Sequence, residues 1–139
     1  MPKVKYPSIK ALKKTAWDTF SRYIRLRDCL KTTGSTVEGR CYTCSRVYPF
    51  RELQAGHLVG GRHNAGLFSE KGVHAQCFNC NITLRGNTLE YRRRIVAEYG
   101  GGADIELENE AKQTKKFTVE ELQALTIYYT QKITEVSDA

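Results

Sequence analysis

The sequence predicts an α+β fold in which a small core, braced by paired cysteines, is flanked by N- and C-terminal helices. Two Cys-x-x-Cys pairs lie mid-chain, and stretches with helical spacing of apolar residues lie on both sides. A chain of 139 residues is too short for two independent cores, so we expect one domain over residues 1–139. Its expected parts are a basic helix over 8–31, the braced core over 40–86 and C-terminal helices over 88–136.

The composition is that of a globular protein, with 40% hydrophobic and 27% charged residues. No apolar run approaches the roughly 18 residues that span a bilayer. The N-terminal stretch MPKVKYPSIKALKK lacks the pattern of a signal peptide. We therefore expect a cytoplasmic protein with no membrane partner.

The first predicted helix, residues 8–31, has Ser8 as its N-cap. One face carries residues at three- and four-residue spacing, which is typical of an amphipathic helix. The other face is basic. The face with this spacing carries Trp17, Phe20, Tyr23, Ile24 and Arg27. The basic face carries Lys10, Lys13, Lys14, Arg22 and Arg25.

The middle of the chain suits short strands and turns. After a loop over 31–39, residues 40–59 suit a knuckle turn followed by strands, with Val47, Tyr48 and Phe50 as strand formers. Residues 60–66 form a predicted flexible loop, because they contain four glycines or asparagines in seven positions. A second strand is expected over 72–76, and Asn81 is expected to begin a short helix.

Two capping boxes mark the C-terminal helices. Asn87 with Glu90 predicts a helix over 88–99 that stops at the glycine run 100–102. Thr118 with Glu121 predicts the start of the last helix. The apolar side of that helix could pack internally or across a dimer: Leu122, Leu125, Tyr128, Tyr129 and Ile133.

Four of the five cysteines have the spacing of a zinc site. Cys41 and Cys44 form one pair, and Cys77 and Cys80 form the other, with 32 residues between the pairs. Two residues between thiolates let one tight turn place both sulfurs about 2.3 Å from one ion, and two such turns complete a closed tetrahedral site. A redox pair would not explain the second motif. We expect structural Zn²⁺ here and a partly buried, unreactive Cys29.

The net charge of +7 is unevenly distributed. Residues 1–100 contain 18 Lys/Arg and 7 Asp/Glu, whereas residues 101–139 contain 4 and 8. A basic body of this kind favours a polyanionic partner such as DNA, because clustered Lys/Arg release counterions from a phosphate backbone. The alternative is that these helix faces are simply solvated.

All three histidines lie in the segment between the two cysteine pairs. Three within eighteen residues indicate a functional site, although each has a structural alternative. His57 could be a core histidine bonded to the backbone. His74, three residues before Cys77, is expected to support the knuckle, and His63 is expected to be a surface loop residue.

These motifs together resemble an HNH (ββα-metal) nuclease built on a treble-clef-like zinc knuckle. The pattern is Cys-x-x-Cys, then Ala-Gly-His57, a Gly/Arg loop, and Val-His-Ala-Gln-Cys-x-x-Cys-Asn81. It is more closely similar to the phage NinG/Rap recombination proteins, from residues 16–28 through 86–92 to the C-terminal helix. A similar layout occurs in Holliday-junction resolvases of the endonuclease VII type. The resemblance implies a structure-specific endonuclease for branched DNA, encoded by a phage and active in host cytoplasm.

The resemblance also implies roles for individual residues. His57 would be the general base that deprotonates the attacking water. Asn81 would bind a catalytic Mg²⁺ or Mn²⁺ through its amide oxygen, unless it is only a helix cap. Arg62 would contact the phosphate. Further DNA contacts are expected from Lys13, Lys14, Arg22, Arg25, His63, Arg85, Arg92 and Arg93.

The sequence departs from the family pattern at the expected carboxylates. HNH enzymes of this type place Asp where this chain has Gly56, and NinG-like proteins place Asp where it has Gln54 and Asn where it has Gly72. Glu52, expected on the same strand with the same facing as Gln54, could substitute as a metal ligand, and Gln54 could ligate through its amide oxygen. Without a carboxylate, the alternative function is a non-catalytic zinc-braced protein that binds DNA junctions. Resolvases often act as two-fold dimers, so a homodimer is possible.

Overall fold

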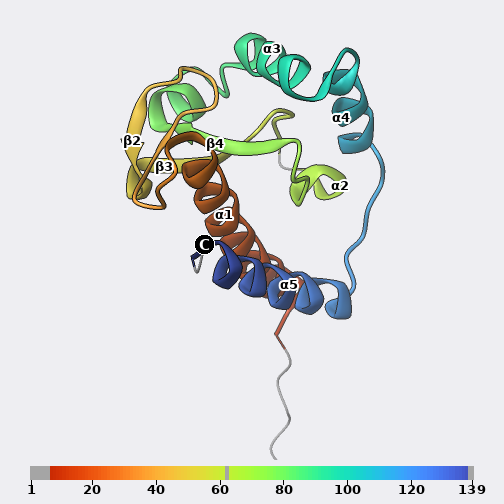
Figure 1. The fold of residues 1–139 in the computed structure, drawn as a ribbon. Helices are drawn as coiled ribbons and strands as arrows, with labels where there is room; N and C mark the ends of the chain where they lie inside the picture. The colour runs from red at the N-terminus through yellow and green to blue at the C-terminus, as the bar shows by residue number, and fades with distance from the viewer. Residues whose placement is uncertain (1–6, 62, 138–139) are drawn as a thin grey trace, which may run out of the picture.

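The structure is a computed structural model that describes residues 7–61 and 63–137 (Figure 1). Helices dominate, and the strands form two separate antiparallel pairs. This confirms the predicted α+β class. The elements in order are α1 (Ile9–Thr33), β1 (Glu38–Arg40), β2 (Val47–Pro49), the 3-10 turn η1 (Phe50–Glu52), β3 (Leu53–His57), α2 (Asn64–Leu67), β4 (Val73–Cys77), the π-helical turn η2 (Asn79–Thr83), α3 (Thr88–Tyr99), α4 (Ala103–Ala111) and α5 (Val119–Ser137).

Helix α1 begins and ends as its sequence predicts, within two residues. The Ser8 side chain accepts a hydrogen bond from the amide of Ala11, which satisfies a free N–H of the first turn. The helix ends at Gly34, whose φ of 76° is left-handed and strains any residue with a Cβ. No described helix is both long and apolar enough to cross a membrane.

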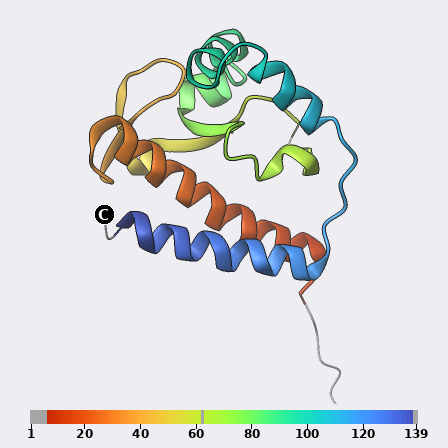
Figure 2. The same cartoon turned by 45° about the vertical axis from the view of Figure 1, so that its right-hand side comes forward.

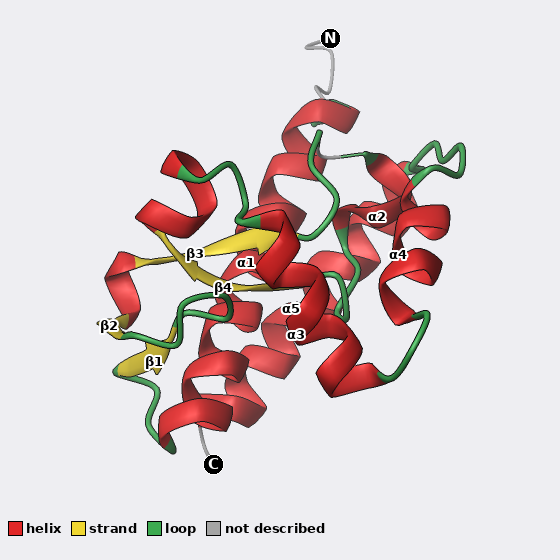
Figure 3. Cartoon of the chain, turned by 90° about the horizontal axis from the view of Figure 1, so that it is seen from above, coloured by secondary structure: helices red, strands yellow, loops and turns green. Residues whose placement is uncertain are grey.

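The β3–β4 hairpin lies across α1 at the centre of the molecule (Figure 3). Its register pairs Gln54 with Gln76 and Gly56 with His74, so these four residues share one face. The opposite face, which includes Ala55 and Val73, packs against α1 and α5. The smaller β1–β2 hairpin places the first cysteine pair between its two strands.

Each face of the β3–β4 hairpin is covered by helices. In Figure 1, α1 and α5 lie on one side and α3 with α4 on the other. Phe20, Ile24 and Tyr129 build the core on the first side. Tyr91 and Ile95 from α3 build the core on the second side, together with Leu58 and Leu107. Because both faces are buried, polar residues inside the hairpin must find internal partners.

Helix α5 runs alongside α1 in the same direction (Figure 2). Its predicted capping box is confirmed, because Thr118 Oγ1 accepts from the Glu121 amide and the Glu121 carboxylate accepts from the Thr118 amide. Leu122 and Tyr129 are buried within this chain. Part of the apolar side of the last helix therefore packs internally, whereas Tyr128 on that side is 46% exposed.

Several local predictions are wrong. Phe50 lies in η1 rather than in a strand, and residues 64–67 of the predicted loop form α2. Helix α4 was not predicted, since its acidic sequence buries little apolar surface. Asn87 adopts a left-handed conformation and makes no side-chain cap, while Glu90 pairs with Arg93 and Arg94 instead of closing a capping box.

A buried polar network joins α1 to β4. The Asp28 carboxylate accepts from the Ala75 amide at 2.8 Å and from Arg27 Nε at 2.9 Å, and its Oδ2 lies 3.3 Å from His74 Nδ1. Arg27 also donates to the carbonyls of Glu70 and Val73. Burial alone would raise the pKa of Asp28, but the contact with His74 and the charge of Arg27 lower it.

We predict that Asp28→Asn lowers the free energy of unfolding by about 3 kcal/mol, because it leaves half-buried Arg27 without its charge partner. Urea denaturation at pH 7 measures this. Since the carboxyl pKa is depressed in the folded state, its contribution is complete above about pH 4 and is lost as the pH falls through the folded pKa. The difference between the two proteins should therefore shrink in acid. Asp18→Asn, which removes an exposed partner of Lys14, is the control and should change little.

Candidate metal centre and adjoining cleft

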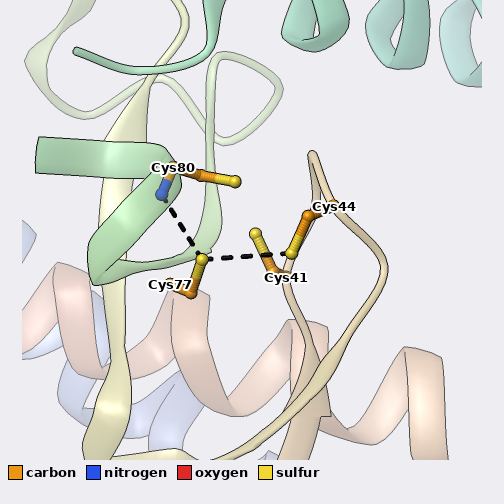
Figure 4. Close-up of side chains that lie close together, drawn as sticks. All are labelled: Cys41, Cys44, Cys77 and Cys80. Atoms are coloured by element: carbon orange, nitrogen blue, oxygen red, sulfur yellow. Dashed lines mark hydrogen bonds between the residues drawn. The ribbon is translucent and has the colours of Figure 1, made fainter. Parts of the chain in front are cut away.

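The four paired cysteines converge at one point (Figure 4). Their sulfur atoms all lie within 4.8 Å of one another, and Cys44 Sγ is 3.9 Å from Cys77 Sγ. Four sulfurs about 2.3 Å from one tetrahedral ion lie about 3.8 Å apart, so the arrangement has the right dimensions. The first pair comes from the turn between β1 and β2. The second pair comes from the end of β4 and from η2, so the centre joins two parts of the chain.

The donor set fits a structural zinc ion. Cys41, Cys77 and Cys80 are buried, and Cys44 is half-buried. Thiolates at such a site need hydrogen-bond donors around them. The Cys80 amide donates to Cys77 Sγ at 3.4 Å, and Asn87 Nδ2 donates to Cys80 Sγ at 3.6 Å. The four cysteines could therefore hold a metal ion, with all four tetrahedral positions filled by sulfur.

Cys29 stands apart from this centre. It is fully buried between α1 and the hairpins, beside Leu53 and Ala75. Burial raises the pKa of its thiol to about 11, which suppresses the reactive thiolate. It packs as a small apolar side chain, more deeply buried than the sequence suggested.

A cleft of about 570 Å³ lies between α1, β3 and η2. It contains three of the residue types that the sequence singled out: a histidine, an asparagine and arginines. None of the described residues that line it carries a carboxylate. The lining residues are Trp17, Ser21, Arg25, Leu53, Gln54, Ala55, His57, Gly60, Gly61, Asn81, Ile82, Arg85 and Gly86.

His57 is oriented by two contacts at the end of β3. Its ring stacks on Trp17, with centroids 5.0 Å apart and planes 18° apart. Its Nε2 lies 3.2 Å from the carbonyl oxygen of Leu67. A carbonyl can only accept, so Nε2 carries the proton and the lone pair of the neutral imidazole is on Nδ1. Trp17, which sequence analysis assigned only to a helix face, is thus part of this site.

Asn81 and Gln54 are brought together across the cleft. Asn81 Nδ2 donates to Gln54 Oε1 at 2.8 Å, which fixes which way the Asn81 amide points. Asn81 does not begin the helical turn, because η2 starts at Asn79. Its side chain therefore does not act as the predicted helix cap, and its Oδ1 faces the hairpin near Gly56.

The hairpin leaves no room for a side chain at Gly56. A Cβ there would lie 1.8 Å from Gln76 Oε1 and 2.9 Å from Asn81 Oδ1. Gln76 is fully buried, and its Nε2 donates to Thr43 Oγ1 and to the Gly86 carbonyl. Its Oε1 is unpaired, the only such buried side-chain atom among the described residues. Sequence analysis missed Gln76, because only the fold places its side chain over Gly56.

Other predicted site residues have different positions. Glu52 is exposed in η1, is not on strand β3 as expected, and does not line the cleft. His63 is exposed in the loop before α2 and, with His57, lines a second small pocket. His74 is buried and stacks on Tyr42 of the first knuckle at 3.8 Å. It thus contacts the knuckle from outside the cleft. The predicted phosphate ligand Arg62 lies outside the described residues.

The predicted DNA-contacting residues fall into two groups. Arg25 and Arg85 line the cleft, and Arg22 lies beside Arg25 over the ring of Phe50. Trp17 also lines a neighbouring hollow with the α1 lysines, so the basic surface continues along that helix. The α3 arginines are instead paired with carboxylates. Arg92 contacts Asp104 and Glu108, and Arg93 contacts Glu90. On α1, Lys13 donates to Asn64, and Lys14 pairs with Asp18.

The chain matches a model of a protein family. The model described as Bacteriophage Lambda NinG protein matches residues 2–138. The chain belongs to the NinG family. This family comprises phage proteins of the recombination region. Neither the curated proteins nor the solved structures that were compared with the chain gave a match. The NinG match spans both cysteine pairs and the whole lining of the cleft.

We predict one zinc ion per chain, measured by elemental analysis of protein purified without added metal. Cys77→Ala should lose the zinc and unfold at a lower temperature, because it opens the closed site. Cys29→Ala is the matched control and should keep a full zinc content, since Cys29 lies outside the centre. Full zinc occupancy in Cys77→Ala would contradict the assignment.

Proposed function

We propose that this NinG-family chain is a metal-dependent, structure-specific endonuclease of the HNH type that acts on branched DNA such as Holliday junctions. One observation carries the proposal. A single cleft contains His57, the Asn81–Gln54 pair, Arg25 and Arg85. The β3–β4 hairpin and the turn η2 that form it are braced by the four-cysteine centre. This arrangement supports the HNH-like core that the sequence suggests.

His57 is proposed as the general base. In the tautomer fixed by the Leu67 carbonyl, Nδ1 can accept a proton from water. The oxygen of that water attacks phosphorus, the bond from phosphorus to the leaving oxygen breaks, and the proton passes to Nδ1. Stacking on Trp17 holds the ring in one orientation, so little rotational freedom is lost when the substrate binds.

A divalent cation, Mg²⁺ or Mn²⁺, is proposed beside Asn81. The amide oxygen Oδ1 of Asn81 is the atom that can ligate the cation, because Nδ2 donates its hydrogen bond to Gln54. When bound, such an ion would stabilise the negative charge on the phosphate and the leaving oxygen. Gln54 holds Asn81 in position. Since the described cleft residues include no carboxylate, substrate phosphate would supply much of the compensating charge.

The basic cleft and the lysines of α1 support DNA as the substrate, and membership of a phage recombination family supports branched DNA. The proposed place of action is the cytoplasm of the infected host. Two symmetric strands must be cut to resolve a four-way junction, so the active form is proposed to be a homodimer.

A second candidate function is a zinc-braced junction-binding protein that does not cut DNA. The specific observation in its favour is the missing carboxylate: Gln54 and Gly56 stand at the family's Asp positions, and the expected substitute Glu52 lies outside the cleft. Neutral amide oxygens bind divalent cations more weakly than carboxylates do. The same basic surface would serve this function.

The decisive experiment is cleavage of a labelled four-way junction with Mg²⁺ or Mn²⁺. We expect cuts near the branch, and a loss of rate of about 10²-fold or more in His57→Ala, since a general base contributes that much. Asn81→Ala should lose activity and need more metal. Asn109→Ala removes an exposed amide from α4 and is the control for Asn81.

Retention of zinc and of the melting temperature would show that these variants are folded. If folded His57→Ala cleaves the junction at the wild-type rate, His57 is not the general base. Tight junction binding with no cutting in either metal would favour the second candidate.

A separate prediction concerns the basic lining. Arg25→Ala and Arg85→Ala should each weaken junction binding and reduce the slope of log affinity against log salt by about 1, as expected when one phosphate contact is lost. Fluorescence anisotropy over a salt series measures this. Lys132→Ala removes the same charge from α5, outside the cleft, and should leave the slope unchanged. Equal slopes in the wild type and all three variants would mean that the cleft does not contact the DNA backbone.

A further inference from the structure

Exposed apolar side chains lie on and directly beside η2, which forms part of the cleft wall. Phe78, Ile82 and Leu84 are all large apolar residues, with 58%, 51% and 50% of their surface exposed. We call these three residues the η2 ridge. Ile82 itself lines the cleft, next to Arg85. Exposed apolar side chains that gather on one short segment mark a binding surface more often than scattered ones do.

The metal centre explains why these side chains point outward. Cys77 and Cys80 are buried and directed at the other two sulfurs. Phe78 lies between them in sequence, so the inward cysteines leave it on the outer surface of the turn. Ile82 follows Phe78 by one helical turn, and both therefore lie on the same side of the segment.

The segment is also held rigidly. The Gly86 amide donates to the Cys80 carbonyl, and the Gly86 carbonyl accepts from buried Gln76. The turn η2 is a π-helical turn, a geometry found frequently at functional sites. A rigid support means that the ridge loses little conformational freedom when it makes a contact.

The charge around these apolar side chains favours a polyanionic partner. Arg25 and Arg85 line the same cleft as Ile82, and the described lining has no carboxylate, so the surface is complementary to a polyanion. An aromatic ring beside cations is suited to the faces of DNA bases, which stack on such rings. Aliphatic side chains such as Ile and Leu are inserted between base steps by proteins that unstack DNA.

We propose that the η2 ridge contacts the exposed base pair at a DNA branch point, with Ile82 inserted beside it and Phe78 stacked on a base face. Continuous duplex presents no such face, because every base pair is covered by its neighbours. The ridge would therefore recognise branch structure, while the arginines bind the backbone. This inference rests on the proposed function for its substrate, but it concerns binding and not cleavage.

The test uses a four-way junction with 2-aminopurine, which fluoresces when unstacked, at the branch. The full chain is added with Ca²⁺ in place of Mg²⁺, and fluorescence and affinity are measured together. We expect fluorescence to rise with wild-type protein. Phe78→Ala and Ile82→Ala should each weaken junction binding about tenfold and abolish the rise, with binding to plain duplex unchanged. Ile105→Ala, which removes an equally exposed side chain from α4, is the matched control.

The outcomes separate the two proposals. Unchanged junction affinity and fluorescence in both ridge variants would overturn the ridge inference even if the wild-type protein cuts DNA. Loss of the signal in the variants, with no cutting in any metal, would support the ridge and count against the nuclease. A ridge variant that changes only self-association would assign the surface to a protein interface. Failure of the wild-type protein to bind the junction would overturn both proposals.

Discussion

The rest of the structure depends on the convergence of four cysteine sulfurs. The β1–β2 turn supplies two of them, and the end of β4 with η2 supplies the others. Neither two-stranded pair would be stable alone in water, because each is too small to bury enough apolar surface. Joining them through one centre fixes the position of η2 against β3. That position in turn decides where Asn81 lies and which side chains of η2 face outward.

A chain of polar contacts connects this centre to the cleft. Thr43 lies within the first cysteine pair, 3.5 Å from Cys41 Sγ, and accepts a hydrogen bond from Gln76. Gln76 Oε1 fills the space over Gly56 beside Asn81. The Thr43 hydroxyl, the Gln76 amide and Gly56 pack against one another. Position 56 therefore has no space for a carboxylate side chain. The same contacts couple the metal centre to the residues proposed to act on DNA.

The second support is the Asp28 network, which ties α1 to β4 through the Ala75 amide and His74. Helix α1 brings Trp17 and Arg25 to the cleft, so their positions depend on this attachment. The cleft is therefore assembled from segments that are remote in sequence. The side chains proposed for catalysis come from β3 and η2, and those proposed for DNA binding come largely from α1.

The sequence by itself determined the features that depend on local spacing: the α+β class, the two cysteine pairs, the Ser8 cap and the Thr118–Glu121 capping box. It also identified His57 and Asn81 as residues that share a site. Only the tertiary structure decided the contacts between distant segments. These include the stacking of Trp17 on His57, the bond from Asn81 to Gln54, and the pairing of Arg92 with α4 carboxylates. Asn87 could not be predicted correctly, because its left-handed backbone, and the Cys80 sulfur that accepts from its Nδ2, arise only when the chain folds.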